Sequence, residues 1–149
     1  MTLGIHNTGK EWRLDYIFLD ETGVSSLDVG LFNDSTDNLN EEDDIGDITT
    51  EPVGSAYVRQ SVSFGINFTN SFDSENWQTV FDDLTFDLSD SSQIVNAVFV
   101  VVHFDSDYAG DGGTAQDHLL FTRPLGATWD ASVIDGTKTV MQVTETLGG

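Results

Sequence analysis

The chain contains no cysteine and very few basic residues, and both shortages narrow what it can be. Without cysteine it can form neither a disulfide framework nor a thiolate nucleophile, and zinc sites built on cysteine are excluded. Five lysine and arginine residues stand against 26 aspartate and glutamate residues, for a formal net charge of -21. A nucleic-acid partner requires a basic face, and Arg13, Arg59 and Arg123 are too few and too scattered to form one.

Long apolar runs are also missing. The longest strongly apolar stretch, Val98 to Val102, is far too short to cross a bilayer, so we expect no membrane insertion. Met1 to Lys10 lacks the apolar core of a secretory signal peptide. We therefore expect the protein to be made in the cytoplasm, and to leave it only by lysis or within a particle.

Acidic side chains are what the chain has in excess, and three explanations compete: a disordered acidic tail, a calcium-loaded protein, or a protein from a high-salt cytoplasm. The acidic residues are interleaved with aromatic and β-branched residues along the whole chain, which disfavours a disordered tail. In molar salt the Debye length is about 3 Å, so repulsion among surface carboxylates is screened while their hydration keeps the protein soluble. The composition favours a halophilic source.

The N-terminal segment has a helical pattern. A capping-box pattern beginning at Thr8 predicts a short helix over residues 8–21. Trp12 and Tyr16 share one face of this helix, but Phe18 falls on another, so the helix is apolar nearly all round. Such a helix packs either between its own domain and a neighbouring subunit or entirely within its own fold.

From residue 26 to about residue 147 the pattern is β. Apolar and polar residues alternate from Val58 to Phe68, as in a half-buried antiparallel strand. Ile94 to Phe104 is apolar on both faces, which predicts a central strand covered on both sides. Further strands are expected at Leu27–Phe32, Trp77–Phe81, Leu84–Leu88, Leu119–Thr122, Trp129–Ile134 and Val140–Val143, with a hairpin turn at Asp135–Gly136.

These seven or eight strands predict a mostly β fold. We expect a single domain over residues 1–149, built as an antiparallel β-sandwich with one short N-terminal helix, and a jelly roll is one candidate topology. A long acidic loop should run from Asn33 to Ile48. Its apolar residues Leu39 and Ile45 should anchor the loop to the surface of the domain.

A second acidic stretch, which begins at Asp105, is the best candidate for a metal site. It opens like an EF-hand loop, with Asp107 at the third position and glycine at the sixth. However, it has Ala109 at the fifth position and Gln116 in place of the bidentate glutamate at the twelfth. Asp105, Asp107 and Asp111 remain candidate ligands for calcium or magnesium in another geometry, but an ordinary acidic turn is the favoured interpretation.

No catalytic arrangement stands out. His103 ends the expected central strand and His118 opens the next, so the two could be neighbours and form a metal site with Asp105 and Asp117. The favoured interpretation is that these histidines are held by hydrogen bonds. Carboxylate pairs occur throughout so acidic a chain, and no motif selects a glycosidase pair. We expect a protein that is not an enzyme and has no cofactor.

Four short signatures occur in order in the first part of the chain. They are Asn7 to Phe18, the strand Gly30-Leu31-Phe32-Asn33, the segment Asp47 to Pro52, and Gly54 to Arg59 with its Tyr-x-Arg ending. In this order they resemble the opening of a diffuse group of structural proteins of tailed viruses. The resemblance covers residues 7–60, and only a general β pattern follows. The acidity departs from that group and suggests a virus of a halophilic archaeon or bacterium.

The resemblance implies a virion component that decorates the capsid, forms a turret or belongs to the tail. It implies a homo-oligomer that also contacts the major capsid protein or other virion proteins, and it carries no catalytic residues. We expect the adhesive face to include Trp12, Tyr16 and Phe18 of the helix together with Tyr57 and Arg59.

Two other functions remain as alternatives. A β-sandwich module that binds carbohydrate or a host surface would use Trp77 or Trp129 as a stacking platform, with a calcium ion near Asp105. A hydrolase with a carboxylate pair is the least favoured of the three. An exposed aromatic residue in a groove would favour the binding module, whereas an extended contact surface of over about 1,000 Å² would favour a capsomer protein.

Overall fold

The computed structural model describes most of the β region of the chain. The described residues are 6, 24–62, 68–73, 76–104, 116–133, 137–140 and 144–146. The expected helix over residues 8–21, with Trp12, Tyr16 and Phe18, lies outside them. So do the candidate metal ligands Asp105, Asp107 and Asp111 and the expected turn at Asp135–Gly136.

The described part of the chain is mostly β, and every strand pair is antiparallel. Its one α-helix, α2 (Asp34–Asp37), has four residues and is followed by the 3-10 turn η1 (Ile45–Asp47). No helix within these residues is long and apolar enough to cross a membrane. The strands are β1 (Val24–Phe32), β2 (Gln60–Val62), β3 (Phe68–Asp73), β4 (Asn76–Phe81), β5 (Leu84–Asp87), β6 (Ile94–Phe104), β7 (Gln116–Asp130), β8 (Thr137–Val140) and β9 (Thr144–Thr146).

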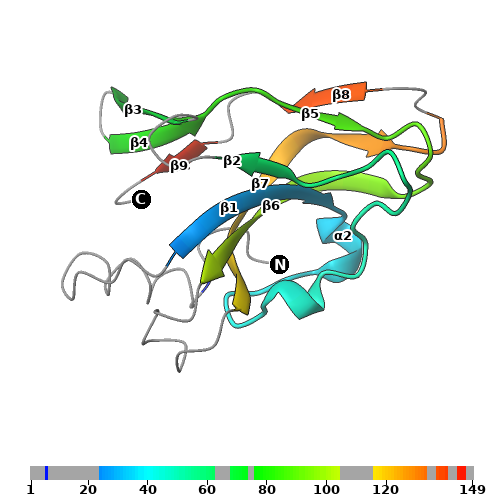
Figure 1. The fold of residues 1–149 in the computed structure, drawn as a ribbon, viewed down its shortest axis with the longest axis horizontal. Coiled ribbons are helices and arrows are strands. Elements are labelled where there is room, and N and C mark those ends of the chain that lie inside the picture. Colours follow the sequence, from blue (N-terminus) through cyan, green and yellow to red (C-terminus); the bar gives the residue numbers. More distant parts are fainter. Residues whose placement is uncertain are drawn as a thin grey trace.

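A four-stranded sheet in the order β2-β1-β6-β7 forms the centre of the fold, and we call it the main sheet (Figure 1). Strand β6 has the predicted bounds and the predicted central place. Its residues Val98 to Val102 are all buried, because β-branched side chains project to both faces of the sheet and both faces are covered. Two smaller groups, β3-β4-β9 and β5-β8, complete the described strands.

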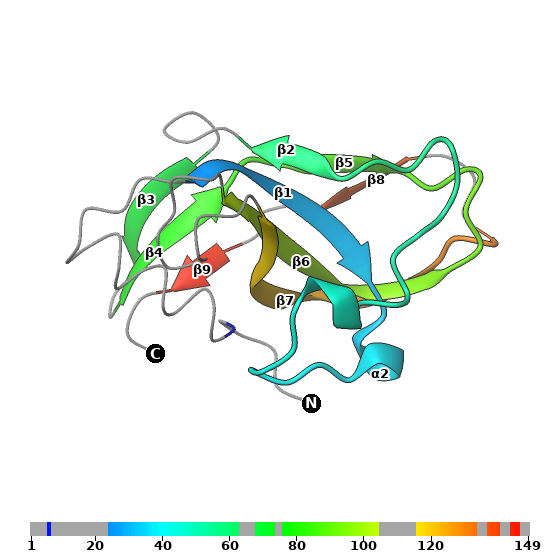
Figure 2. The ribbon, with the colours of Figure 1, turned by 60° about the horizontal axis from the view of Figure 1, so that its bottom comes forward.

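The two faces of the main sheet are covered by different parts of the chain (Figures 1 and 2). On one face, Phe86 and its neighbours from β5 pack on the inward residues of β1 and β6. On the other face, the acidic segment 33–50 covers a second cluster that includes Phe99, and Leu39 is almost wholly buried there. Ile45 packs on the same cluster. The expectation that Leu39 and Ile45 tack this segment to the surface is therefore confirmed.

Strand β7 differs from its prediction. We expected two strands, Leu119–Thr122 and Trp129–Ile134, but one 15-residue strand runs through Pro124 and Gly126. Residues 131–133 form a turn instead of continuing the second expected strand. The strand survives these two turn-forming residues because β7 is an edge of the main sheet, where proline leaves no ladder bond unmade, and because bulges absorb the irregularity.

The expected alternation from Val58 was also wrong at its start. Val58 is exposed rather than buried. The side chain that turns inward is that of the preceding residue, Tyr57, which the expected alternation does not include. The reason is that the strand begins only at Gln60, so the residues before it follow the irregular backbone of 54–59. From β2 onward Val62 points into the core as predicted.

Candidate functional site

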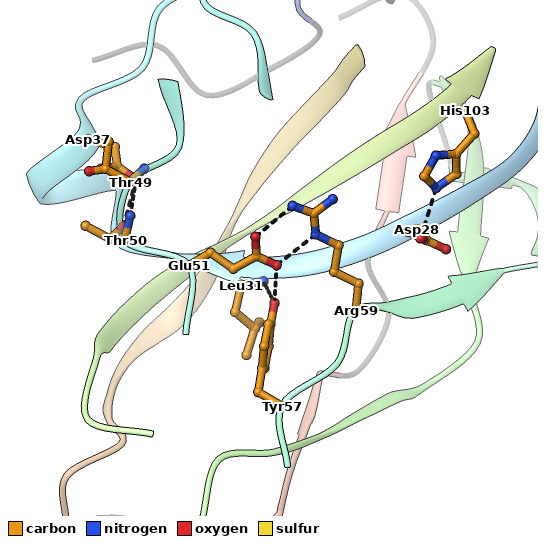
Figure 3. Close-up of polar contacts among 9 residues, drawn as sticks. All are labelled: Asp28, Leu31, Asp37, Thr49, Thr50, Glu51, Tyr57, Arg59 and His103. Carbon is orange, nitrogen blue, oxygen red and sulfur yellow. Dashed lines mark hydrogen bonds and ion pairs between the residues drawn. The ribbon is translucent and has the colours of Figure 1, made fainter. Parts of the chain in front are cut away.

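Three stretches of chain meet around the carboxylate of Glu51 (Figure 3). Arg59 donates two hydrogen bonds to it, from Nε to Oε1 at 2.8 Å and from Nη2 to Oε2 at 2.7 Å. The hydroxyl of Tyr57 donates to Oε1 at 3.0 Å and accepts from the backbone N–H of Leu31, in β1, at 2.9 Å. We call Leu31, Glu51, Tyr57 and Arg59 the Glu51 cluster. It fastens the segment 51–59 to the main sheet.

Tyr57 is the buried aromatic member of the Glu51 cluster. Tyr57 is 8% exposed, and its ring stacks on that of Phe86 with centroids 6.0 Å apart. Burial and the nearby Glu51 carboxylate raise the pKa of the Tyr57 hydroxyl far above its usual value, so it stays a neutral donor. The hydrogen bond to Glu51 likewise raises the pKa of Arg59. The cluster is therefore a fixed set of hydrogen bonds rather than a proton-transfer site.

The guanidinium of Arg59 also lies over an aromatic ring. Its Cζ atom is 5.1 Å from the centroid of Phe99, a cation–π distance. The ring of Phe99 reaches this position because Gly30, its cross-strand neighbour, has no side chain. A Cβ atom placed on Gly30 would come within 2.3 Å of the Phe99 ring. Glycine is thus required at residue 30 by the close approach of the ring.

A second polar group crosses three strands of the main sheet at His103. Its Nε2 lies 2.9 Å from a carboxylate oxygen of Asp28 in β1, and its Nδ1 contacts Asp117 in β7. Carboxylates only accept, so both contacts are hydrogen bonds when the ring carries two protons. Burial alone would lower the pKa of His103, but the bonds to Asp117 and Asp28 outweigh it and raise the pKa. When protonated, His103 therefore links β1, β6 and β7 through the two carboxylates.

The acidic segment is fastened at its base by Asp37. Its carboxylate accepts from the hydroxyls of Thr49 at 2.6 Å and Thr50 at 2.7 Å, and from both backbone N–H groups (Figure 3). The N–H of Asn33 donates to the Thr50 hydroxyl oxygen at 2.7 Å. These bonds hold the two ends of the segment together and leave its middle to project over the sheet.

The middle of the acidic segment is fastened to β7 by Asp44. One carboxylate oxygen accepts from the N–H of Leu119, and the other contacts Nδ1 of His118, each at 2.6 Å. Burial would raise the pKa of Asp44, but the hydrogen bonds from Leu119, His118 and Ile45 outweigh it and lower the pKa. Nearby, Nδ1 of His6 lies 3.0 Å from the carbonyl oxygen of Asp43. Burial lowers the pKa of His6.

Asp34 lies at the start of α2 and is buried. Among the described residues, it is the buried acid that has a side-chain oxygen without a hydrogen-bond partner. Burial raises its pKa, which favours the protonated form. Its backbone N–H donates to the side chain of Asn96 at 2.8 Å and so ties α2 to β6. The role that its contacts support is structural.

The described residues contain no assembled metal site. None of their His, Asp and Glu side chains form a group of three or more that could hold a metal ion. His103 contacts its two carboxylates through opposite sides of its ring, which does not suit chelation of one ion. The hydroxyl of Ser61 donates to the carboxylate of Asp28 at 2.6 Å and not to an imidazole, so it does not form the serine–histidine pair of a nucleophilic enzyme.

The sequence-based site residues have different outcomes. Tyr57 and Arg59 come together, but the Tyr57 ring is buried, so of the two only Arg59 offers a partly exposed side chain, at 30%. An interface role for Arg59 stays a prediction. The expectation that His103 and His118 are held by hydrogen bonds is confirmed. Trp129, a candidate stacking platform, packs partly buried against the core.

Sequence reasoning missed Glu51 and Asp44 as organising residues. Glu51 was noted only as part of a Glu-Pro segment, yet its spacing from the Tyr-x-Arg sequence carried the signal. Asp44 is one of many acids in its loop, and only the N-capping position before Ile45 distinguishes it.

No protein-family model, curated protein or solved structure matches the chain. Its function is therefore argued from its own residues.

Proposed function

We propose that this chain is a non-enzymatic structural protein of a virion, which assembles on the capsid or tail of a tailed virus of a halophile. The observation that carries the proposal is the Glu51 cluster. Three of the four signatures that resemble tailed-virus proteins contribute to it. The first of these supplies Leu31 and also contains Gly30, the second supplies Glu51, and the third supplies Tyr57 and Arg59. They meet in space and fasten the segment 51–59 to the main sheet, as suits a group of proteins that share a rigid body and no catalytic centre.

The polar groups of the described residues support the same role. The carboxylates of Asp37, Asp44 and Glu51 accept hydrogen bonds from the chain's own backbone, hydroxyl and guanidinium groups. Side chains engaged in this way hold a scaffold together. In the proposal the small sheets and the main sheet form the layers of a β-sandwich of jelly-roll type, and the remaining carboxylates face concentrated salt, where their charges are screened.

The partners follow from this role. The chain associates with copies of itself and with the major capsid protein or another virion protein. The adhesive face comprises the segment with Trp12, Tyr16 and Phe18, together with the partly exposed Arg59. Cation–π contact with Phe99 and the bonds to Glu51 hold the Arg59 guanidinium in one orientation, so little side-chain entropy is lost when a partner binds it.

Two measurements test the proposal. Light scattering after size exclusion in about 2 M KCl, where the Debye length is only a few Å, should give the mass of a discrete oligomer. Density-gradient fractions from the producing host should contain the chain together with the major capsid protein. Finding the chain only in fractions without particles would refute a virion role. A monomer found in the particle fraction would restrict the proposal to decoration of a lattice that supplies the symmetry.

Variants separate the adhesive face from the body. Trp12→Ala or Phe18→Ala should weaken assembly more than it weakens the folded monomer. The reason is that an interface side chain loses its contacts with the partner in addition to its contacts within its own fold. Phe72→Ala, which removes an exposed aromatic ring from β3, is the matched control and should leave assembly unchanged. Equal losses of assembly and monomer stability in the Trp12 and Phe18 variants would show that their segment is purely internal.

A further inference from the structure

The acidic segment is fastened differently at its two ends and in its middle. Its base, residues 33–37 with 49–50, is closed by the bonds of Asp37 to two threonines and by α2. Its middle, residues 38–48, lies on the main sheet, and we call it the strap (Figure 2). The base is therefore held by local bonds that need no contact with the sheet. The strap depends on what it touches.

Charge is concentrated in the strap. It contains four consecutive acidic residues, Glu41 to Asp44, and a fifth at Asp47. From β7, His118 faces Asp44, and His6 lies against the backbone of Asp43. The whole chain, the strap included, carries a net charge of -21. Repulsion within the strap, and between the strap and the rest of the molecule, thus opposes its docking wherever salt does not screen it.

Within the described residues, apolar and polar contacts hold the strap against this repulsion. Leu39 is buried, and Ile45 and Ile48 are partly buried against the cluster around Phe99. The carboxylate of Asp44 forms the polar latch, with Leu119 and His118 each at 2.6 Å. Concentrated salt screens the repulsion and leaves the apolar contacts in place, so the balance shifts toward the docked strap.

We propose that the strap is a salt-dependent cover: it lies on the main sheet in concentrated salt and swings away, about its fastened base, in dilute salt. The Debye length grows from about 3 Å in molar salt to about 10 Å in tenth-molar salt, so repulsion among the strap carboxylates is screened far less in dilute salt. Undocking uncovers the outward N–H of Leu119 on the edge strand β7 and the apolar surface beneath Leu39. This inference concerns the fold itself and does not depend on a virion role.

Hydrogen exchange resolved by residue tests the proposal. The main reporter is the amide of Leu119, whose bond to Asp44 joins the strap to β7. The amides of Asp47 and Ile48 bond within the strap and report whether its own turn stays formed. On transfer from about 2 M to about 0.1 M KCl, exchange of the Leu119 amide should accelerate at least about tenfold relative to the amide of Val100 in β6. The amide of Asn38, which donates to Asp34 at the base, should follow Val100.

Two pairs of neutralising substitutions supply the matched comparison. Glu41→Gln with Glu42→Gln removes two exposed charges from the strap, and Asp82→Asn with Asp83→Asn removes two exposed charges between β4 and β5. Only the first pair should restore slow exchange of Leu119 in dilute salt. Asp44→Asn should release the strap even in concentrated salt, because a neutral amide is a weaker acceptor for the Leu119 N–H.

Each alternative outcome contradicts the proposal. Equal acceleration of Leu119 and Val100 would mean that dilute salt unfolds the whole domain and releases no separate strap. Unchanged exchange of Leu119 in dilute salt would mean that the latch and the apolar contacts outweigh the repulsion. Equal rescue by the two neutralised pairs would show that net charge, and not the position of the charge in the strap, decides the exchange rate.

Discussion

At the scale of single residues, Tyr57 connects the sheet to the segment beside it. Its hydroxyl is both a donor to Glu51 and an acceptor from the buried N–H of Leu31, so it satisfies two groups at once. Its ring contributes separately, through the stack on Phe86. The two contributions can be separated by a substitution that keeps the ring and removes the oxygen.

Tyr57→Phe should destabilise the fold by about 1–3 kcal/mol, because the Leu31 N–H is left without its acceptor while the ring stays in place. Urea denaturation in molar salt measures this loss. Val58→Ala, a truncation at the exposed neighbouring residue, should change the stability by no more than about 0.5 kcal/mol. A Tyr57→Phe variant as stable as the parent would show that the Leu31 N–H readily finds another acceptor.

Gly30 is the second residue whose replacement has a defined consequence. Gly30→Ala places a methyl group within 2.3 Å of the Phe99 ring, which must shift away from Arg59, so the variant should lose about 1–3 kcal/mol by overpacking. Gly46→Ala is the control, since a Cβ atom there meets nothing within 4 Å. Thermal unfolding of both variants measures this loss of stability. Equal melting temperatures for the two variants would mean that the Phe99 ring moves aside without destabilising the fold.

At the scale of elements, the sequence predicts best where one physical effect dominates. The bounds of strand β6 were predicted to the residue because an apolar run rich in β-branched residues favours a strand covered on both faces. Strand β7 was split because Pro124 and Gly126 are turn-forming residues, and the sequence alone does not reveal that this strand lies at a sheet edge. The Glu51 cluster was missed because its members come from different stretches and meet only in the fold.

His103 links β1, β6 and β7, and its protonation should therefore affect the stability of the main sheet. Its folded pKa lies above the ordinary value of 6.5, so the link contributes fully below about pH 6.5 and is lost as the pH rises through the raised pKa. The melting temperature at constant salt should therefore fall between neutral and alkaline pH. His103→Gln should flatten this dependence, whereas a parallel decline in parent and variant would assign it to other groups.

At the scale of the whole molecule, the net charge of -21 makes ionic strength a determinant of stability. Lowering KCl from about 2 M to about 0.1 M should lower the melting temperature, because screening of the carboxylates weakens as the Debye length grows. Calorimetry at a series of salt concentrations measures the effect. An unchanged melting temperature would remove the halophilic interpretation, and potassium replaced by sodium controls for effects of the particular cation.

The Glu51 cluster also constrains how this sequence can diverge. A change at Glu51 alone removes the hydrogen-bond acceptor of the Arg59 guanidinium and of the Tyr57 hydroxyl. Substitutions at these three positions are therefore expected to accumulate together or not at all. Exposed residues between them, such as Val53, are expected to vary more freely. Distant kin that have lost overall similarity should therefore retain the spaced pattern Glu-x5-Tyr-x-Arg after a Gly-Leu strand, and that pattern is the probe with which to search for them.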